Sequence, residues 1–120
     1  PENAVGFIYM IEHIPTGKYY IGKKNLWAKR TLPPLKGKKR KRKVIKESDW
    51  KSYMSSNQWI KEEASVDVTS FKKKILQFCY SAKSLTYYEL YWQFKYNVLA
   101  DENSLNDNLL GKFFRKDLDI

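Results

Sequence analysis

Hydrophobic and polar positions near the start of the chain form two short runs separated by a break. Residues 5–11 alternate with period two and are rich in β-branched and aromatic side chains, which predicts a strand. Residues 13–18 interrupt the strand, because Pro15 cannot donate a backbone hydrogen bond to a neighbouring strand and Gly17 can take the positive φ of a reversal. A second short strand, residues 19–21, comes next, and Gly22 ends it. The pattern therefore predicts a β-hairpin.

This hairpin brings Tyr9 and Tyr20 together on one sheet. Two tyrosines on paired strands are most often a packing pair, which contributes about 0.5–1.5 kcal/mol beyond the buried area. Spacing alone favours packing over catalysis. His13, the single histidine of the chain, falls in the turn and is expected to be a turn residue without a catalytic role.

The segment after the hairpin predicts a short helical turn. Asn25 can cap such a turn, which would place Leu26, Lys29 and Arg30 on one face and return Arg30 toward the hairpin. The proline pair at 33–34 would end it, since prolines and the residues before them disfavour helix.

A strongly basic run follows, with seven positive charges in the eight residues 36–43. Such a run repels itself and would be disordered alone, so a solvated tail or a localisation signal is one interpretation. Its position inside the chain favours a loop that orders on a phosphate backbone. We expect the basic residues of this run, together with Lys23 after the hairpin, to bind nucleic acid: Lys23, Lys36, Lys38, Lys39, Arg40, Lys41, Arg42 and Lys43.

The second half of the chain predicts a helix, a strand and another helix. The first helix starts at Ser56 or Asn57, and a strand follows over 66–80, with its lysines on the exposed face. The period then changes from 2 to 3.6, and Ser81 or Ser84 can cap the second helix. Its apolar stripe is formed by Leu85, Tyr88, Trp92 and Tyr96. After a polar loop, residues 109–114 are expected to return to the core.

Glu89 is the one acidic residue that this pattern turns inward. A carboxylate among aromatic side chains is costly unless it is paired or binds a cation. An ion pair with a lysine or arginine is the ordinary explanation, and a chain with many cations supplies one easily. Metal binding is the alternative.

Charge changes the picture more than the rest of the composition. The 120 residues carry 23 Lys and Arg against 13 Asp and Glu, a net charge of +10 with a pI near 9.6. This surplus on one small domain indicates a polyanionic partner. A single Cys and a single His exclude a disulfide within the chain and a multi-cysteine zinc site. With no spanning apolar run and no signal pattern, we expect a cytoplasmic protein without a membrane partner.

Together these residues resemble the GIY-YIG nuclease family, in particular its phage-encoded, homing-endonuclease-like members. Residues 7–9 match the first motif and residues 20–22 the second, with Phe7 where the first motif has glycine. Arg30 follows at the family's spacing, and Glu89 lies on the helix that carries the family's metal-binding glutamate. Asn106, or else Asn108, resembles the family's final asparagine. The resemblance covers nearly the whole chain.

The resemblance implies a small α/β (α+β) fold, with a three-stranded, mainly antiparallel sheet flanked by helices. The whole chain would form one nuclease domain with a basic insertion at about 31–57. It would hydrolyse DNA, as a duplex, with one Mg²⁺ or Mn²⁺ held by Glu89 and no small-molecule cofactor. The catalytic residues would be Tyr9, Tyr20, Arg30, Glu89, Lys24 and Asn106.

The chemistry of these residue types agrees with that assignment. A phenol has an ordinary pKa near 10 and can activate water near neutral pH only if cations lower it. We expect Lys23, Lys24 and Arg30 to do so, with Tyr9 as the activating group and Tyr20 positioning water or phosphate. The family's histidine is replaced by Pro34, so Lys23 and Lys24 are candidate bases. The rival hypothesis is a catalytically silent DNA- or RNA-binding module on the same fold.

Overall fold

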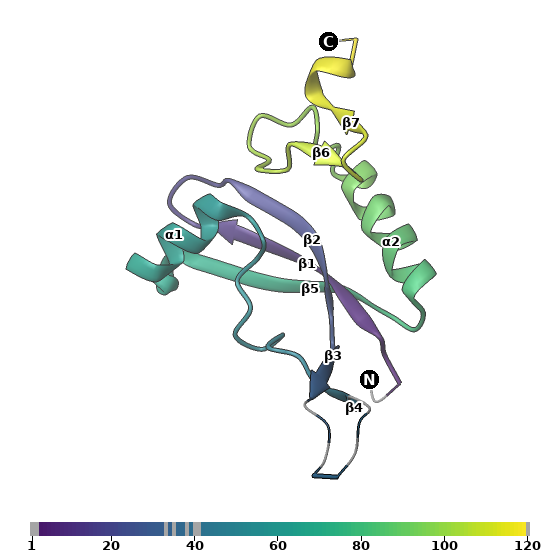
Figure 1. The fold of residues 1–120 in the computed structure, drawn as a ribbon. Helices are drawn as coiled ribbons and strands as arrows, with labels where there is room; N and C mark the ends of the chain where they lie inside the picture. Colours follow the sequence, from purple (N-terminus) through teal and green to yellow (C-terminus); the bar gives the residue numbers. More distant parts are fainter. Residues whose placement is uncertain (1–2, 33, 35, 38, 40–41, 120) are drawn as a thin grey trace.

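A three-stranded antiparallel sheet forms the centre of the computed structural model (Figure 1). The structure describes residues 3–32, 34, 36–37, 39 and 42–119, with the backbone alone for 29–32 and 42–44. The strand order is β2 (Tyr19–Asn25), β1 (Gly6–His13) and β5 (Phe71–Cys79). This confirms the predicted sheet and the small α+β fold class.

The hairpin forms where its turn signals predict it. Gly17 takes a φ of 72°, and its N–H donates to the His13 carbonyl at 2.8 Å. Strands β1 and β2 then pair from Glu12 opposite Tyr19 to Gly6 opposite Asn25. The local sequence therefore fixes the register of these strands, and with it the position of both tyrosines.

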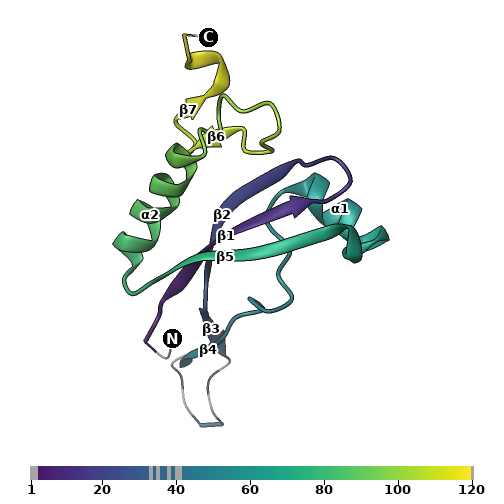
Figure 2. The same cartoon turned by 180° about the vertical axis from the view of Figure 1, so that it is seen from behind.

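Each face of the sheet buries its own hydrophobic core. Helix α2 (Ala82–Lys95) lies along one face and contacts all three strands (Figures 1 and 2). Its own Leu85 packs there against buried side chains that include Ile8, Ile21, Cys79 and Val98. Helix α1 (Gln58–Val66) and the segment before it cover the other face, where Phe7, Tyr9, Ile11, Ile60 and Phe71 pack.

Both helices begin at predicted caps. The Asn57 side chain accepts the Ile60 N–H at 3.1 Å, and Ser81 and Ser84 form a reciprocal capping box. The strand after α1 begins later than predicted. Because α1 continues to Val66 and a 3-10 turn occupies Val68–Ser70, β5 starts at Phe71 and not at residue 66.

The predicted helical turn at Asn25–Arg30 is wrong. Asn25 ends β2, and a new strand, β3 (Trp27–Leu32), pairs antiparallel with β4 (Arg42–Glu47). The Leu26 N–H donates to the Val5 carbonyl at 2.9 Å, which keeps the chain extended as it leaves the sheet. A partner strand provides hydrogen bonds that a single helical turn cannot match. The basic insertion thus contains one strand of a two-stranded ribbon.

The C-terminal part forms a short hairpin, β6 (Asn108–Leu109) and β7 (Phe113–Phe114). Leu109 is buried, but Leu110, Phe113 and Phe114 are exposed, so the predicted return of 109–114 to the core holds only for Leu109. The tight turn at Leu110 and Gly111, both with positive φ, projects the rest outward. Across the described part of the chain, no helix is long and apolar enough to cross a membrane.

Candidate active site

Tyr9 and Tyr20 lie next to each other, on the sheet face covered by α1. Tyr9 pairs with Gly22 and Tyr20 with Ile11, so the two rings are diagonal neighbours with centroids 6.3 Å apart. A Cβ atom at Gly22 would come within 2.6 Å of Tyr9 Oη and 2.9 Å of Tyr20 Cε2. Glycine at this position therefore allows both rings to lie across β2.

The segment 48–57 seals Tyr9 from solvent. Tyr9 is 1 % exposed, its hydroxyl donates to Ser55 Oγ at 3.4 Å, and the Tyr53 ring packs edge-on at 5.8 Å. Burial is the largest influence on the Tyr9 pKa and raises it far above that of a free phenol. The prediction that nearby cations lower this pKa does not hold in the structure.

Lys73 fastens the covering segment to the sheet. Its ammonium group donates to the carbonyls of Trp50 at 2.6 Å and Tyr53 at 2.9 Å. Lys73 is half-buried, and desolvation followed by repulsion from Lys24 lowers its pKa. The predicted exposure of the β5 lysines is thus correct for Lys72 and Lys74 and wrong for Lys73.

Ser55 is held in an unusual backbone conformation within this segment. Its φ is 111°, a region that L-residues rarely occupy, and its side chain is buried. Ser55 Oγ also accepts the Asn57 N–H at 3.1 Å, beside the start of α1. Ser55 therefore links the Tyr9 hydroxyl to the helix that covers it.

Tyr20 has a more open and more polar environment. It is half-buried, and its hydroxyl is hydrogen-bonded to Ser56 Oγ at 3.3 Å. Desolvation raises the Tyr20 pKa, the Ser56 hydrogen bond lowers it, and the negative charge of Glu89 raises it. Tyr20 is thus the tyrosine whose hydroxyl is electrostatically coupled to Glu89.

Glu89 lies on α2, which packs on the sheet face opposite the two tyrosine rings, and its carboxylate lies beside Lys23 of the edge strand β2. Desolvation raises its pKa, while the charge and the backbone N–H of Lys23 lower it. The Lys23 ammonium donates to Thr86 Oγ1 at 2.9 Å, one turn before Glu89 on α2. The carboxylate therefore lacks full compensation from protein cations.

This arrangement fits a divalent cation with few protein ligands. Among the described residues, no group of three or more His, Cys, Asp or Glu could hold a metal. Mg²⁺ retains several waters and binds through one or two carboxylates together with substrate phosphate. Half-buried Glu89 has the donor chemistry for such an ion, and a cation would relieve its desolvation.

Lys24, a candidate base, already has other partners. Its ammonium forms a 2.7 Å ion pair with Asp49 and lies 4.1 Å from the centroid of the Tyr53 ring. These contacts tie β2 to the covering segment, in a structural role that sequence analysis did not predict. Arg30 pairs with Val44 in the β3–β4 ribbon.

The predicted nucleic-acid-binding residues are described in part. Lys36 and Lys39 are exposed, and Arg42 and Lys43 belong to β4. Lys38, Arg40 and Lys41 lie outside the described residues.

Asn106 holds the backbone of β2 beside the tyrosines. Its amide oxygen accepts the Ile21 N–H at 3.0 Å, and its amide nitrogen donates to the Ile21 carbonyl at 2.8 Å. Both hydrogen bonds are buried, so Asn106 positions the strand between Tyr20 and Gly22. Asn108, the alternative, accepts the Gly111 N–H in the β6–β7 turn and contributes to that turn.

His13 does not join the site. Its ring packs against Trp59 and Phe71 with centroids about 5 Å away, and Nδ1 hydrogen-bonds to Thr16 Oγ1 at 2.7 Å. His13 is buried at the end of β1. This agrees with a non-catalytic role, but His13 packs in the core and is not simply a turn residue.

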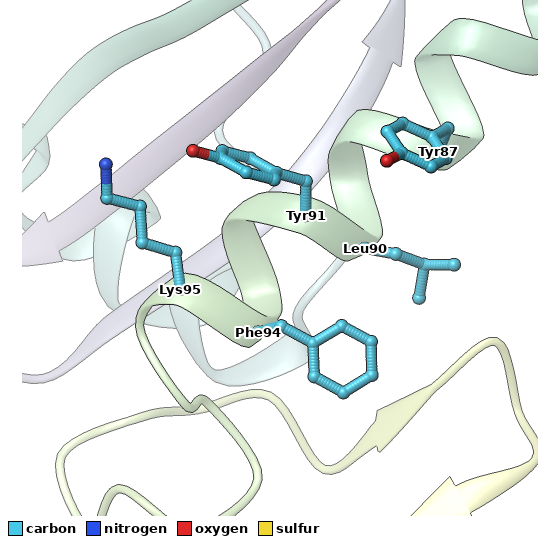
Figure 3. Close-up of a pocket in the computed structure, with 5 residues that line it drawn as sticks. All are labelled: Tyr87, Leu90, Tyr91, Phe94 and Lys95. Atoms are coloured by element: carbon cyan, nitrogen blue, oxygen red, sulfur yellow. The ribbon is translucent and has the colours of Figure 1, made fainter.

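A groove of about 920 Å³ lies between the end of β2, the ribbon and the start of α2, where Thr86, one turn before Glu89, lines it. Lys23, Lys24, Trp27, Ile45 and Thr86 contribute to its lining. A second hollow of about 600 Å³ lies on α2 and is lined by Tyr87, Leu90, Tyr91, Phe94 and Lys95 (Figure 3). None of the predicted site residues lines the second hollow, so the groove is the better candidate for substrate.

The arrangement defines a small α+β domain with two hairpin tyrosines, a helix glutamate and lysines at one sheet edge. A family model described as "Putative endonuclease segE, GIY-YIG domain" matches residues 1–114. The chain therefore belongs to the GIY-YIG endonuclease family, and a nuclease domain acts on nucleic acid. Searches of curated proteins and of solved structures found no match.

Sequence reasoning missed the covering segment. Tyr53, Ser55 and Ser56 contact the two tyrosines. Ser55 lies 46 residues after Tyr9 in the sequence, and Ser56 lies 36 residues after Tyr20. The turn-rich composition around them gave no sign of what they would cover. Only the aromatic side chains of Trp50 and Tyr53 in a polar stretch could have suggested a packed segment.

Proposed function

We propose that the domain is a metal-dependent endodeoxyribonuclease that hydrolyses phosphodiester bonds of duplex DNA with one Mg²⁺ or Mn²⁺. The observation that carries this proposal is the under-compensated carboxylate of Glu89, coupled to Tyr20 and Lys23 at the edge of β2. An ordinary structural carboxylate would be paired or fully solvated. The charge of +10 supports a polyanionic substrate.

In this proposal, Glu89 holds the metal ion, which supplies charge stabilisation at the scissile phosphate when bound. Lys23 contacts the phosphate, because a cationic donor forms strong hydrogen bonds with its oxygens. Arg30, which lies in the β3–β4 ribbon, contacts the DNA backbone away from the scissile phosphate. Asn106 keeps β2 in register without touching substrate.

The two tyrosines take roles opposite to those expected from sequence. Tyr20 orients the attacking water, because its hydroxyl is partly accessible and lies near Glu89. Tyr9 supports the Tyr20 ring from within the core, because its own hydroxyl is buried against Ser55. The raised pKa values of both phenols favour positioning of water over proton abstraction.

Plasmid nicking tests the proposal directly. Supercoiled DNA should be nicked or linearised with Mg²⁺ or Mn²⁺ and remain intact with EDTA. Glu89→Gln should abolish cleavage, whereas Glu102→Gln, at an exposed site in the loop after α2, serves as the matched control. Cleavage by the Glu89→Gln protein at the rate of the unaltered protein would refute the metal role.

The alternative is a silent DNA- or RNA-binding module on the same fold. The sealed hydroxyl of Tyr9 is the observation that favours it. Tight binding of duplex or single-stranded nucleic acid without cleavage in either metal would support this alternative. The phage origin and the homing role remain predictions of the family resemblance, and the cytoplasmic location remains a prediction from sequence composition.

A further inference from the structure

The β3–β4 ribbon projects away from the sheet and both helices (Figures 1 and 2). Its six residue pairs run from Trp27 opposite Glu47 to Leu32 opposite Arg42. At about 3.4 Å per residue the paired strands span roughly 20 Å. In the described part of the ribbon, the residues with described side chains are exposed except half-exposed Ala28.

Such a ribbon is a poor structure on its own. A lone two-stranded hairpin is marginally stable in water, and each strand leaves one edge of backbone hydrogen-bonding groups unpaired. In the described chain, the extensive contacts of β3 and β4 are with each other. Among the described elements, the ribbon therefore has no extensive packing partner.

Its charge identifies the chemistry of the missing partner. Its two strands contain five basic residues and one acid: Lys29, Arg30, Arg42, Lys43, Lys46 and Glu47. Lys36 and Lys39 are exposed in the connection between the strands. Like charges on paired strands repel, so a polyanion would stabilise the ribbon.

The dimensions of the ribbon select one groove of a DNA duplex. A strand pair with side chains on both faces is about 10 Å thick, the distance at which sheets pack. The major groove of B-DNA is about 12 Å wide and accepts a two-stranded ribbon, whereas the minor groove is only about 6 Å wide. We propose that the β3–β4 ribbon inserts into the major groove of the duplex that the active site cuts.

The base of the ribbon connects this contact to the catalytic edge. Trp27 and Ile45 are 47 % and 67 % exposed, and strand alternation puts their positions on one face of the ribbon. Both line the groove that also contains Lys23 and Lys24. A duplex held by the ribbon would thus lay a phosphate backbone along this groove, which is lined by Thr86, one helical turn before Glu89.

This inference rests on the proposed function, but its test does not require cleavage. Binding of the Glu89→Gln protein to a fluorescent duplex of mixed sequence is measured by anisotropy, in competition with methyl green or netropsin. Methyl green occupies the major groove and netropsin the minor groove. Both are cations, so electrostatic competition is similar in the two arms. We expect methyl green to displace the protein at least tenfold more effectively than netropsin does.

Ribbon variants provide the second measurement. Lys46→Gln should weaken duplex binding several-fold and reduce the salt slope by about one. Lys61→Gln, at an exposed position on α1, should change neither. Hydrogen exchange should show that the amides of β3 and β4 gain protection when duplex is added. Circular dichroism confirms that each variant is folded.

The outcomes separate the ribbon from the nuclease activity. Displacement by netropsin alone would overturn the major-groove assignment. Unchanged binding by Lys46→Gln together with no added protection in β3 and β4 would show that the ribbon does not contact DNA. Either result can occur in a protein that cuts DNA. Conversely, the ribbon could prove necessary for DNA binding while the unaltered protein fails to cleave DNA with Mg²⁺ or Mn²⁺. That result would refute the nuclease proposal and support the ribbon inference.

Discussion

Tyr9 and Tyr20 are the same residue type on adjacent strands, yet they occupy different environments. Tyr9 is enclosed by Phe7, Tyr53 and Ser55, and its hydroxyl is removed from solvent. Tyr20 lies on the edge strand, where its hydroxyl is hydrogen-bonded to Ser56 and the negative charge of Glu89 raises its pKa. We call these the sealed side and the open side of the site.

Two tyrosines on the same hairpin can therefore have different roles. Strand position decides accessibility: β1 is central and β2 is an edge. A central strand can be covered on both faces, whereas an edge strand leaves room for a helix side chain to reach around it. Changes on the open side should therefore alter catalysis, and changes on the sealed side should alter stability.

The largest expected effect is on the open side, at Glu89. Glu89→Gln should reduce cleavage by at least ~10³-fold, because charge stabilisation at the phosphate is worth several kcal/mol. Single-turnover cleavage of a labelled duplex measures this loss. DNA affinity should stay equal or rise slightly, since a negative charge is removed.

The same variant should be more stable at neutral pH. Burial raises the Glu89 pKa, so the folded protein binds this proton more strongly than the unfolded chain does. Stability from this residue is present below the ordinary Glu pKa and falls as pH rises through the raised one. Thermal melts should give a higher Tm for Glu89→Gln at pH 7 and no gain at pH 4. A lower Tm at pH 7 would contradict the desolvation argument.

Phenylalanine substitutions separate the two tyrosines. Tyr20→Phe should slow cleavage by ~10²-fold or more, the low end of the contribution of a positioned proton-transfer group. Tyr9→Phe should slow cleavage less than tenfold, because its hydroxyl is buried and donates to Ser55. Both rings remain, so the fold and DNA affinity should be unchanged. A larger loss for Tyr9→Phe would reverse the sealed and open assignments.

Gly22→Ala should damage both sides through packing. The new methyl group would lie 2.6 Å from Tyr9 Oη and 2.9 Å from Tyr20 Cε2, so at least one ring must shift. Overpacking of this kind costs about 1–3 kcal/mol of the free energy of unfolding. Urea denaturation measures the loss.

The smallest effect is expected at Ser55, on the sealed side only. Ser55→Ala loses the hydroxyl that bonds Tyr9 and the Asn57 N–H but keeps the disfavoured φ. Ser55→Gly loses the same contacts and relieves the backbone, a strain of about 1–3 kcal/mol. The glycine variant should therefore be the more stable of the two in urea denaturation. The opposite order would show that the φ of Ser55 carries no strain.

Local signals predicted a large share of the fold. The hairpin, the caps at Asn57 and Ser81 and the body of β5 each depend on nearby residues, and each appears as expected, except that β2 continues past Gly22 to Asn25. The inward position of Glu89 also followed from helical period alone. What these features share is that a few neighbouring residues determine their backbone conformation.

The errors have a common cause in contacts distant along the chain. Asn25 looked like a helix cap, but the partner strand that makes β3 begins at Arg42, beyond a basic connection. Lys73 looked solvated, but its hydrogen-bond acceptors lie at Trp50 and Tyr53. No local pattern indicated that Ser55 would cover Tyr9. Sequence could thus nominate site residues but not their accessibility.

The two outer edges of the central sheet bear on how the protein behaves at high concentration. An open strand edge can recruit another chain and start aggregation. Residues 103–106 run beside β2, where Leu105 donates to the Tyr19 carbonyl at 2.7 Å and Asn106 takes both backbone groups of Ile21. The opposite edge, β5, instead carries exposed Lys72 and Lys74, whose charges oppose docking of a second basic chain. Asn106→Ala would leave the Ile21 N–H at the first edge without its partner, so we expect lower solubility during expression and storage.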